Sequence, residues 1–309
     1  MSLARDNEYE WKIVKKSLET PDTYTYSFSP ATVSQRFSFT VGQSVVLSVM
    51  LRRPTKSGQD DVSLVQRAYS IASSPYRDII DLTIKDEKPY GYINPISGKA
   101  DGFAAYFFEQ IKMGDKVRVR PNINRHHFLW KIADGIERDI AYWSGANGAE
   151  SARSLLQFME DTKKEDMRLT LFYSNPRLYQ DNEAKFVNVI YYDWLIQMAK
   201  KMENFQVIFN FTKDQEIQPT DHTRVTYRNG RFFLDEKGKE EKTLSKYHGN
   251  SEAFNPICGS SRFINGTVRL PDGRIERKIG IMQNLTNIER VKPEKIDKEQ
   301  YYLDLAGTN

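Results

Sequence analysis

The residues best suited to chemistry lie in the segment RAYSIASS, from Arg67 to Ser74. Successive side chains of a β-strand alternate between its faces, so Arg67 and Tyr69 are expected to project to one side, with Ser70 along the same edge. A guanidinium can bind pyrophosphate through a fork of hydrogen bonds, and an aromatic ring can stack on a planar heterocycle. The segment therefore predicts a site for a large, flat, anionic ligand. The alternative is an ordinary amphipathic strand.

A second group of small residues forms the segment SGANGAES, residues 144–151. It lies between a predicted strand and a predicted helix, where small residues let the backbone approach a pyrophosphate at the helix N-terminus. Gly145, Ala146 and Asn147 are the candidate contacts, and Asn147 tolerates a positive φ better than most residues. Glu150 would put a negative charge near the phosphates. The alternative is a turn with a purely structural role.

Short strands must position the first of these sites. The amino-terminal part of the chain contains short segments rich in β-branched and aromatic residues, separated by Pro, Gly, Asp or Ser. These segments are residues 23–30, 37–40, 44–50, 68–73 and 79–85. Their spacing predicts an antiparallel β-barrel or sandwich.

After about Arg120, predicted strands alternate with predicted helices. The strands are DIAYWSG, MRLTLFY, FQVIFNFT and FNPICGSS; the helices are expected at residues 150–164, near residues 187–202, and after the last strand. The first helix carries apolar residues at helical spacing. This alternation is typical of a parallel sheet covered by helices.

The length of 309 residues fits two compact domains. We predict an antiparallel β-barrel domain over residues 1–134 and an α/β parallel-sheet domain over residues 135–309. The polar interval 221–249 is interpreted as an insertion or surface excursion, with a hairpin around Asn229 and Gly230.

The composition excludes several classes of protein. Apolar residues make up 39% and charged residues 28% of the chain, as in globular proteins. No segment approaches the roughly 20 apolar residues of a membrane span, and the start lacks an apolar run like that of a secretory signal. We therefore expect a cytoplasmic protein without membrane contact.

The single cysteine, Cys258, excludes an internal disulfide and a cluster held by several thiolates of this chain. The adjacent His126 and His127 lack the spacing of a zinc site, so no metal is expected. The net charge of +4 permits a basic patch for an acidic partner. No motif supports nucleic-acid binding.

The first candidate site resembles a known motif. Arg67, Tyr69, Ser70 and Ser73 match the flavin motif R-x-Y-S-x-x-S/T of the ferredoxin-NADP reductase family, and FTVGQ, at Gly42–Gln43, is similar to the family's F-x-x-G-Q. The resemblance implies that Arg67 binds the FAD pyrophosphate and that Tyr69 lies against the isoalloxazine. Ser70 would form a hydrogen bond near flavin N5, which makes it a candidate catalytic residue.

Residues 101–121 resemble the family's short helix and the strand G-D-x-V-x-V that follows it. A helix beginning near Gly102 would offer N–H groups and a positive dipole end to phosphate, with Phe103, Ala104 and Ala105 as further contacts. The family usually has Ser or Thr where Ala105 stands, so only a backbone contact is implied there. The following PNINRHHF also departs from the family's G-P-x-G-x-F.

The second candidate site resembles the family's nucleotide loop, G-G-T-G-x-x-P, of which this chain keeps Gly145. Arg177, in FYSNPR, is similar to the basic position that the family uses around the adenosine ribose. CGSS, with Cys258 and Gly259, stands in the place of the family's C-G-P-P.

The segment IDKEQY, with Glu299, resembles the family's closing pattern of an acidic residue followed by an aromatic one. The resemblance implies that Cys258 and Glu299 lie beside the nicotinamide as catalytic residues. An alternative for the acidic residue is Glu289, in IERV.

The resemblance implies an FAD-dependent oxidoreductase that moves electrons between NADPH or NADH and a one-electron partner. The partner would be a ferredoxin, a flavodoxin or an oxygenase component. Two alternatives stay open: an FAD-binding electron-transfer or sensor protein that has lost productive nicotinamide binding, and a reductase subunit that is active only in a larger complex. Flavin can accept a hydride and release its electrons singly, so no general base is required.

Overall fold

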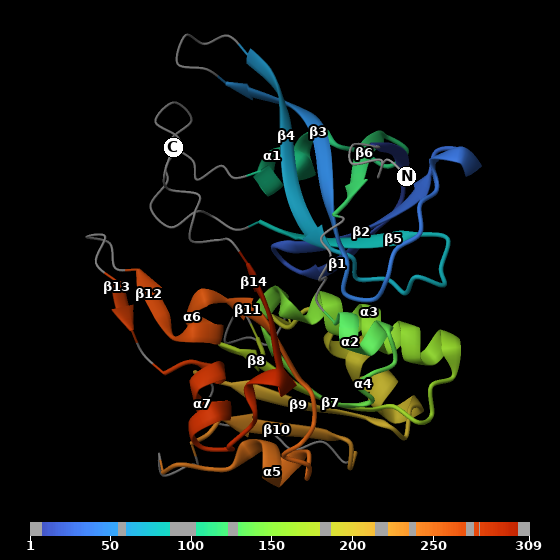
Figure 1. Cartoon of the computed structure of the whole chain (residues 1–309). Coiled ribbons are helices and arrows are strands. Elements are labelled where there is room, and N and C mark those ends of the chain that lie inside the picture. Colours follow the sequence, from blue (N-terminus) through green and yellow to red (C-terminus); the bar gives the residue numbers. More distant parts are fainter. Residues whose placement is uncertain are drawn as a thin grey trace.

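The computed structural model contains two six-stranded sheets, one antiparallel and one parallel (Figure 1). It describes residues 8–54, 60–86, 103–122, 129–179, 187–213, 222–234, 239–269, 275–277 and 279–301.

The antiparallel sheet is built from the amino-terminal part of the chain. Its strands are β1 (Tyr9–Thr20), β2 (Thr23–Pro30), β3 (Ser44–Pro54), β4 (Asp60–Ser70), β5 (Ile80–Lys85) and β6 (Lys116–Pro121). Their spatial order is β4-β3-β6-β1-β2-β5, and α1 (Phe103–Gln110) packs against β3. Alternate side chains, such as Trp11, Phe28 and Leu47, fill a buried core. The predicted antiparallel, barrel-like domain is confirmed.

The parallel sheet follows in the second part of the chain. Its strands are β7 (Asp139–Gly145), β8 (Arg168–Asn175), β9 (Phe205–Phe211), β10 (Val225–Asn229), β11 (Asn255–Ser260) and β14 (Ile296–Tyr301). Their order is β10-β9-β8-β7-β11-β14, and every neighbouring pair is parallel. The predicted parallel α/β half is confirmed.

The remaining elements connect and cover these strands. The helices are α2 (Trp130–Ala133), α3 (Ala149–Thr162), α4 (Tyr192–Lys201), α5 (Thr243–Tyr247), α6 (Ser261–Asn265) and α7 (Ile281–Asn287). The 3-10 turns are Val33–Gln35, Ala146–Gly148 and Pro293–Lys295, and a two-stranded ribbon joins β12 (Thr267–Arg269) to β13 (Ile275–Arg277).

The alternation of side chains along β7 explains the layers of the second half. Ile140 and Tyr142 belong to a core shared with α3 and α4. Ala141 and Trp143 belong to a second core shared with α5, α6 and α7. A strand that is apolar on both faces requires cover on both faces, which is the arrangement of a three-layer α/β domain.

Several predicted boundaries change in the structure. Residues 37–40 form no strand, although Phe37 and Phe39 are buried, because alternating burial does not require a pairing partner. β4 ends at Ser70, where the backbone turns to bind Gln43 and Asp81 through Ile71 N and Ala72 N. Helix α4 begins at Tyr192, five residues later than predicted.

The hairpin predicted around Asn229 and Gly230 is wrong. Residues Val225–Asn229 form β10, which pairs in parallel with β9 and extends the sheet. Gly230 has a φ of +89° and turns the chain so that Phe232 and Phe233 become buried against Trp143. The polar interval thus contributes the strand β10, the helix α5 and the core residues Val225, Phe232, Phe233 and Leu244, while the division of the chain near residue 134 stays a prediction.

Within the described part of the chain, no helix combines the length and hydrophobicity that crossing a bilayer requires. The same residues contain no group of three or more His, Cys, Asp or Glu side chains placed to hold a metal ion. His126 and His127 lie outside the described residues.

A buried histidine links the amino ends of β7 and β8. His248 Nδ1 lies 2.7 Å from Thr170 Oγ1, and its Nε2 lies 2.9 Å from Asp139 Oδ1. Arg168 donates two hydrogen bonds to the same carboxylate, and its guanidinium is also close to the imidazole. Burial lowers the pKa of His248 below its ordinary 6.5, and Arg168 acts in the same direction against the attraction of Asp139.

We therefore expect His248 to make the free energy of unfolding pH-dependent. Because its pKa is lowered in the folded state, the unfolded chain binds more protons as the pH falls below about 6.5, and stability falls until the lowered pKa is passed. Urea unfolding of the wild type and of His248→Gln measures the free energy of unfolding at each pH. The measurements cover about pH 5 to pH 8, the range in which histidine titrates. The difference between the two proteins should vary with pH; a constant difference would contradict the assignment.

Candidate functional site

Arg67 and Tyr69 lie on the same side of β4, next to the first residue of α1. The Arg67 guanidinium carbon is 5.7 Å from the centre of the Phe103 ring, and the Tyr69 and Phe103 ring centres are 6.2 Å apart. Val65, two residues before Arg67, is buried in the barrel, whereas Arg67 is exposed and Tyr69 is half-buried. The strand therefore carries this face from the core out to the rim of the barrel.

The start of α1 supplies the backbone that completes this cluster. Phe103 and Ala104 are buried and pack in the barrel core, so their side chains anchor the first turn of the helix. Ala105 belongs to the same turn, and Gly102 lies outside the described residues. A helix N-terminus beside an exposed guanidinium is an arrangement that favours an anion.

Ser70 and Ser73 are both buried. The Ser73 hydroxyl accepts a hydrogen bond from Asp81 N and donates one to Ile79 O, each at 3.0 Å. These bonds close the loop between β4 and β5, so the Ser73 hydroxyl is engaged within the chain. Upstream, Gly42 has a φ of +75° and the Gln43 amide accepts from Thr40 N, which fixes the turn before β3.

The candidate nucleotide loop follows β7 as the 3-10 turn Ala146–Gly148. The positive φ is at Ala146, at 49°, and not at Asn147 as the sequence suggested. Two tyrosine hydroxyls, one from β7 and one from β8, bind the carbonyl groups of this loop. Tyr173 donates to Ala146 O and Tyr142 donates to Gly148 O. These bonds stabilise a left-handed alanine, which the sequence alone did not indicate.

Gly148 is a residue of the loop that the sequence pattern missed. A Cβ at this position would lie 2.2 Å from Cys258 O, so only glycine lets α3 approach β11 this closely. In dinucleotide-binding folds one glycine of the loop has this role of close helix–strand packing. The available signal was the second glycine of SGANGAES, one residue after Asn147.

Glu150 does not lie exposed beside the loop. It is buried in the first turn of α3, and its charge contributes to raising the pKa of Tyr173 and Tyr191, which burial raises most. Glu150 is thus buried within electrostatic range of Tyr173 and Tyr191.

Cys258, Gly259 and Glu299 come together at adjacent strands. β11 and β14 pair in parallel with Cys258 opposite Glu299, which places the two backbones side by side. The Cys258 side chain is fully buried among the residues that pack under α3.

Glu289 has a structural role instead. It is buried and accepts hydrogen bonds from Leu244 N and from the Ser245 backbone and hydroxyl, which caps α5. The register of β14 therefore favours Glu299 over Glu289 as the acidic residue near Cys258.

Arg177 is exposed in the turn that follows β8. Lys213 N donates to Pro176 O, so the turn after β9 lies against it and brings a second cation, Lys213, to this corner. Ser174 is half-buried at the end of β8. The sequence pattern did not single out Lys213, although it directly follows a predicted strand.

Helix α3 connects the two candidate sites, and Figure 1 shows it between the two sheets. Its first residue follows the nucleotide loop, and its middle contacts the end of the flavin-like motif. Ser154 Oγ donates to Ser73 O, and Gln157 Oε1 accepts from Ser74 N. Arg153 donates to Ala72 O and to Asp81 Oδ2. The flavin-like segment and the nucleotide loop are therefore held by one helix.

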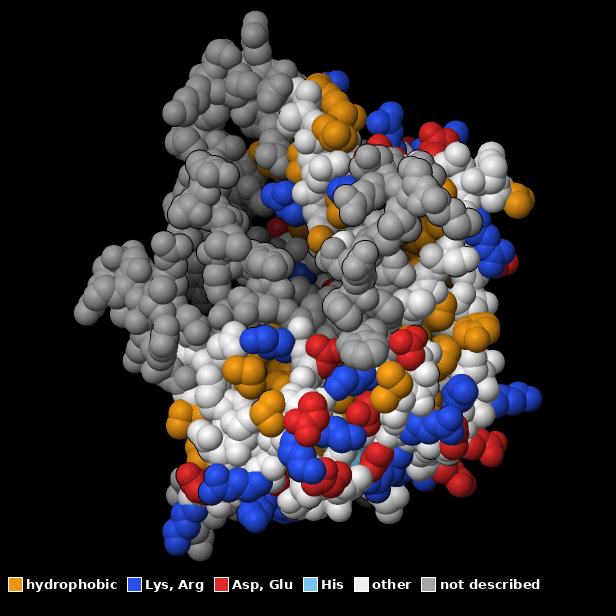
Figure 2. Space-filling view, in the orientation of Figure 1, with side chains coloured by type: hydrophobic (Ala, Val, Ile, Leu, Met, Phe, Trp, Pro, Cys, Tyr) orange, Lys and Arg blue, Asp and Glu red, His pale blue; other side chains and the backbone are white. Residues whose placement is uncertain are grey.

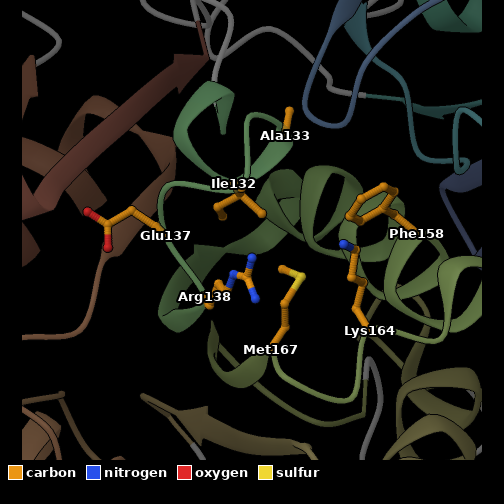
Figure 3. Close-up of a pocket in the computed structure, with 8 residues that line it drawn as sticks. Ile132, Ala133, Glu137, Arg138, Phe158, Lys164 and Met167 are labelled. Atoms are coloured by element: carbon orange, nitrogen blue, oxygen red, sulfur yellow. The ribbon is translucent and has the colours of Figure 1, made fainter.

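A small pocket is present elsewhere, at the amino end of β7 (Figure 3). It is lined by Ile132, Ala133, Gly135, Glu137, Arg138, Phe158, Lys164 and Met167. None of the candidate site residues lines this pocket, so it is separate from them. Figure 2 shows acidic and basic side chains interspersed over the parallel-sheet half of the viewed face.

No protein-family model and no curated protein matches this sequence. Solved structures do match. The FAD/NAD-binding domain of a nitric oxide dioxygenase from Vibrio cholerae is 15% identical, with a TM-score of 0.63 over 96% of this chain and 99% of that one. A ferredoxin NADP+ reductase from Neisseria gonorrhoeae, with bound FAD and NADP, is 16% identical, with a TM-score of 0.58 over 96% and 99%. The cytochrome b5 reductase domain of Ulva prolifera nitrate reductase is 16% identical, with a TM-score of 0.55 over 84% and 90%. The chain thus has the two-domain fold of the ferredoxin-NADP reductase-like FAD/NAD-binding domains.

Proposed function

We propose that this protein is an FAD-dependent NAD(P)H oxidoreductase that passes electrons to or from a one-electron partner such as ferredoxin. The observation that carries the proposal is the cluster of Arg67, Tyr69 and the first turn of α1. The similarity to the Neisseria gonorrhoeae ferredoxin NADP+ reductase, which has bound FAD and NADP, adds support.

The residues of the barrel rim fit an FAD. Arg67 is exposed beside a helix N-terminus, so that charge, fork geometry and N–H groups would converge on a pyrophosphate. Tyr69 offers a half-buried ring for a flat ring system, and Ser70 lies at the end of the same strand. FAD, when bound, supplies the ability to take up two electrons together and to release them one at a time.

The residues of the parallel sheet fit a nicotinamide nucleotide. Gly145, Ala146 and Asn147 would bind its pyrophosphate through the loop, and Arg177 would bind the adenosine side. Cys258, Gly259 and Glu299 would lie near the nicotinamide. The protein's contribution would be to align the two ring systems and to exclude water, because hydride transfer requires contact more than it requires a base.

An anaerobic titration of the reconstituted protein with NADH and with NADPH tests this function. We expect bleaching of the flavin band with at least one nucleotide. The variant Arg177→Ala should bind the preferred nucleotide about tenfold more weakly, because a charge-assisted contact contributes about 1.5–3 kcal/mol. A stable yellow protein that neither nucleotide bleaches would contradict the oxidoreductase.

Such a result would instead support an FAD-binding electron-transfer or sensor protein. One observation favours that second candidate: the ring of Phe263 lies against two of the glycines assigned to the nucleotide.

A further inference from the structure

Two glycines lie side by side at the carboxyl edge of the parallel sheet. Ser144 of β7 is opposite Cys258 of β11, so the next residues, Gly145 and Gly259, are neighbours. A Cβ on Gly259 would lie only 3.5 Å from Gly145 Cα. We call this pair the glycine trough. It lies where the strand order reverses, since β8 to β10 follow on one side of β7 and β11 and β14 on the other. Open α/β sheets bind ligands at that point.

The aromatic ring of Phe263, from α6, covers the glycine trough. A Cβ at Gly145 would lie 2.8, 3.0 and 3.1 Å from three atoms of this ring, and one at Gly259 would lie 2.8 Å from Phe263 Cδ1. The ring is half-buried, with one side against the core that contains Trp143 and Ile257. The space that the two glycines leave by lacking side chains is therefore filled by the Phe263 ring.

We infer that Phe263 is a displaceable cover and that its position sets the affinity for a nicotinamide dinucleotide. The inference rests on the proposed function. With the ring in place, the space that Gly145 and Gly259 leave by lacking side chains is filled, so a dinucleotide that enters this space requires the ring to leave the glycine trough. The apparent affinity is then reduced by the fraction of molecules in which the trough is open.

The adenosine corner, at Arg177 and Lys213, follows β8 and β9, on the other side of β7 from β11. A ligand that carries only the adenosine end would therefore bind without moving Phe263. The two kinds of ligand therefore distinguish a cover from a general change in the domain. A cover changes the affinity for the dinucleotide and leaves the affinity for the adenosine fragment unchanged.

Calorimetric titration of wild type, Phe263→Leu and Phe263→Met with NADP+, NAD+, 2′-AMP and AMP tests the inference. Both variants should bind the better dinucleotide about tenfold more tightly, as expected if the trough is open in roughly a tenth of wild-type molecules, with unchanged affinity for the better mononucleotide. Phe158→Leu, which shortens another half-buried phenylalanine, on α3, is the matched control and should bind like the wild type.

Equal or weaker dinucleotide binding by both Phe263 variants, at wild-type melting temperature, would overturn the inference. So would a parallel gain for 2′-AMP or AMP. Leu and Met keep most of the apolar volume, and if one variant melts early the other decides. The titrations need no flavin, so FAD content measured on the same samples distinguishes a failed cover from a failed flavin assignment.

Discussion

Replacing Arg67 and Tyr69 together with alanine is expected to weaken FAD binding by roughly 100-fold. Hydrogen bonds from a charged group contribute about 1.5–3 kcal/mol each, and an aromatic stack adds about 0.5–1.5 kcal/mol, where 1.4 kcal/mol is about tenfold. The two side chains share one side of β4 beside the start of α1, so both losses fall on the same ligand. The FAD content per chain after reconstitution, from the flavin absorbance, measures the effect.

Two exposed residues of the same types serve as controls for this experiment. Arg118 lies on β6 and pairs with Glu8, and Tyr76 is 67% exposed in the loop after β4. The variant Arg118→Ala/Tyr76→Ala should keep the wild-type flavin content. Normal FAD occupancy in the Arg67→Ala/Tyr69→Ala protein, with an unchanged circular dichroism spectrum, would refute the flavin assignment.

The second large effect is expected at the buried ion pair between the two halves of the molecule. Arg153 of α3 donates to Asp81 Oδ2 at 2.7 Å, and the two side chains are 15% and 6% exposed. The guanidinium also lies over the rings of Tyr191 and Trp194, at 5.0 and 5.5 Å. Arg153→Met would leave the Asp81 carboxylate buried without its cation, which costs about 3–5 kcal/mol. Urea unfolding measures this loss.

A second cross-domain ion pair on the same helix provides the comparison. Arg77 binds Asp161 through two hydrogen bonds and Glu160 through a third, but its side chain is 35% exposed, so water can hydrate the charges when the contacts are lost. Arg77→Met should cost no more than about 1 kcal/mol. Equal losses in Arg77→Met and Arg153→Met would contradict the special role of the buried pair. Adding Asp81→Asn to Arg153→Met should recover part of the stability, since the unpaired charge is then removed.

Both large effects concern the connection between β4 and α3. Arg67 and Tyr69 lie near the end of β4, whose continuation, residues 71–74, is held by α3. Helix α3 in turn begins directly after the candidate nucleotide loop. Under the proposed function, the ion pair of Arg153 and Asp81 would fix the orientation of the flavin ring relative to the nicotinamide ring. The double variant with Asp81→Asn would then keep its FAD and transfer hydride more slowly.

The sequence by itself determined the elements that depend on local alternation. β2 and β7 begin and end at the predicted residues, because a strand with a buried face shows its period in the sequence whatever its partner is. The division into an antiparallel half and a parallel half followed from the change of rhythm near Arg120. The position of Arg67 and Tyr69 on one side of a strand is also a local property.

Only the tertiary structure decided which segments meet. The parallel pairing of β10 with β9 replaced the predicted hairpin, because Asn229-Gly230 specifies a turn and not the strand that follows it. The backbone position of Glu299 opposite Cys258 and the capping role of Glu289 at α5 could be known only from the register of β14 and the contacts of α5. Ala146 adopts a left-handed φ in a loop that tyrosines from two strands hold. Phe263 covers Gly145, which is more than one hundred residues away, and Gly259, which is four residues before it. Such contacts join residues distant in the chain, and local periodicity carries no information about them.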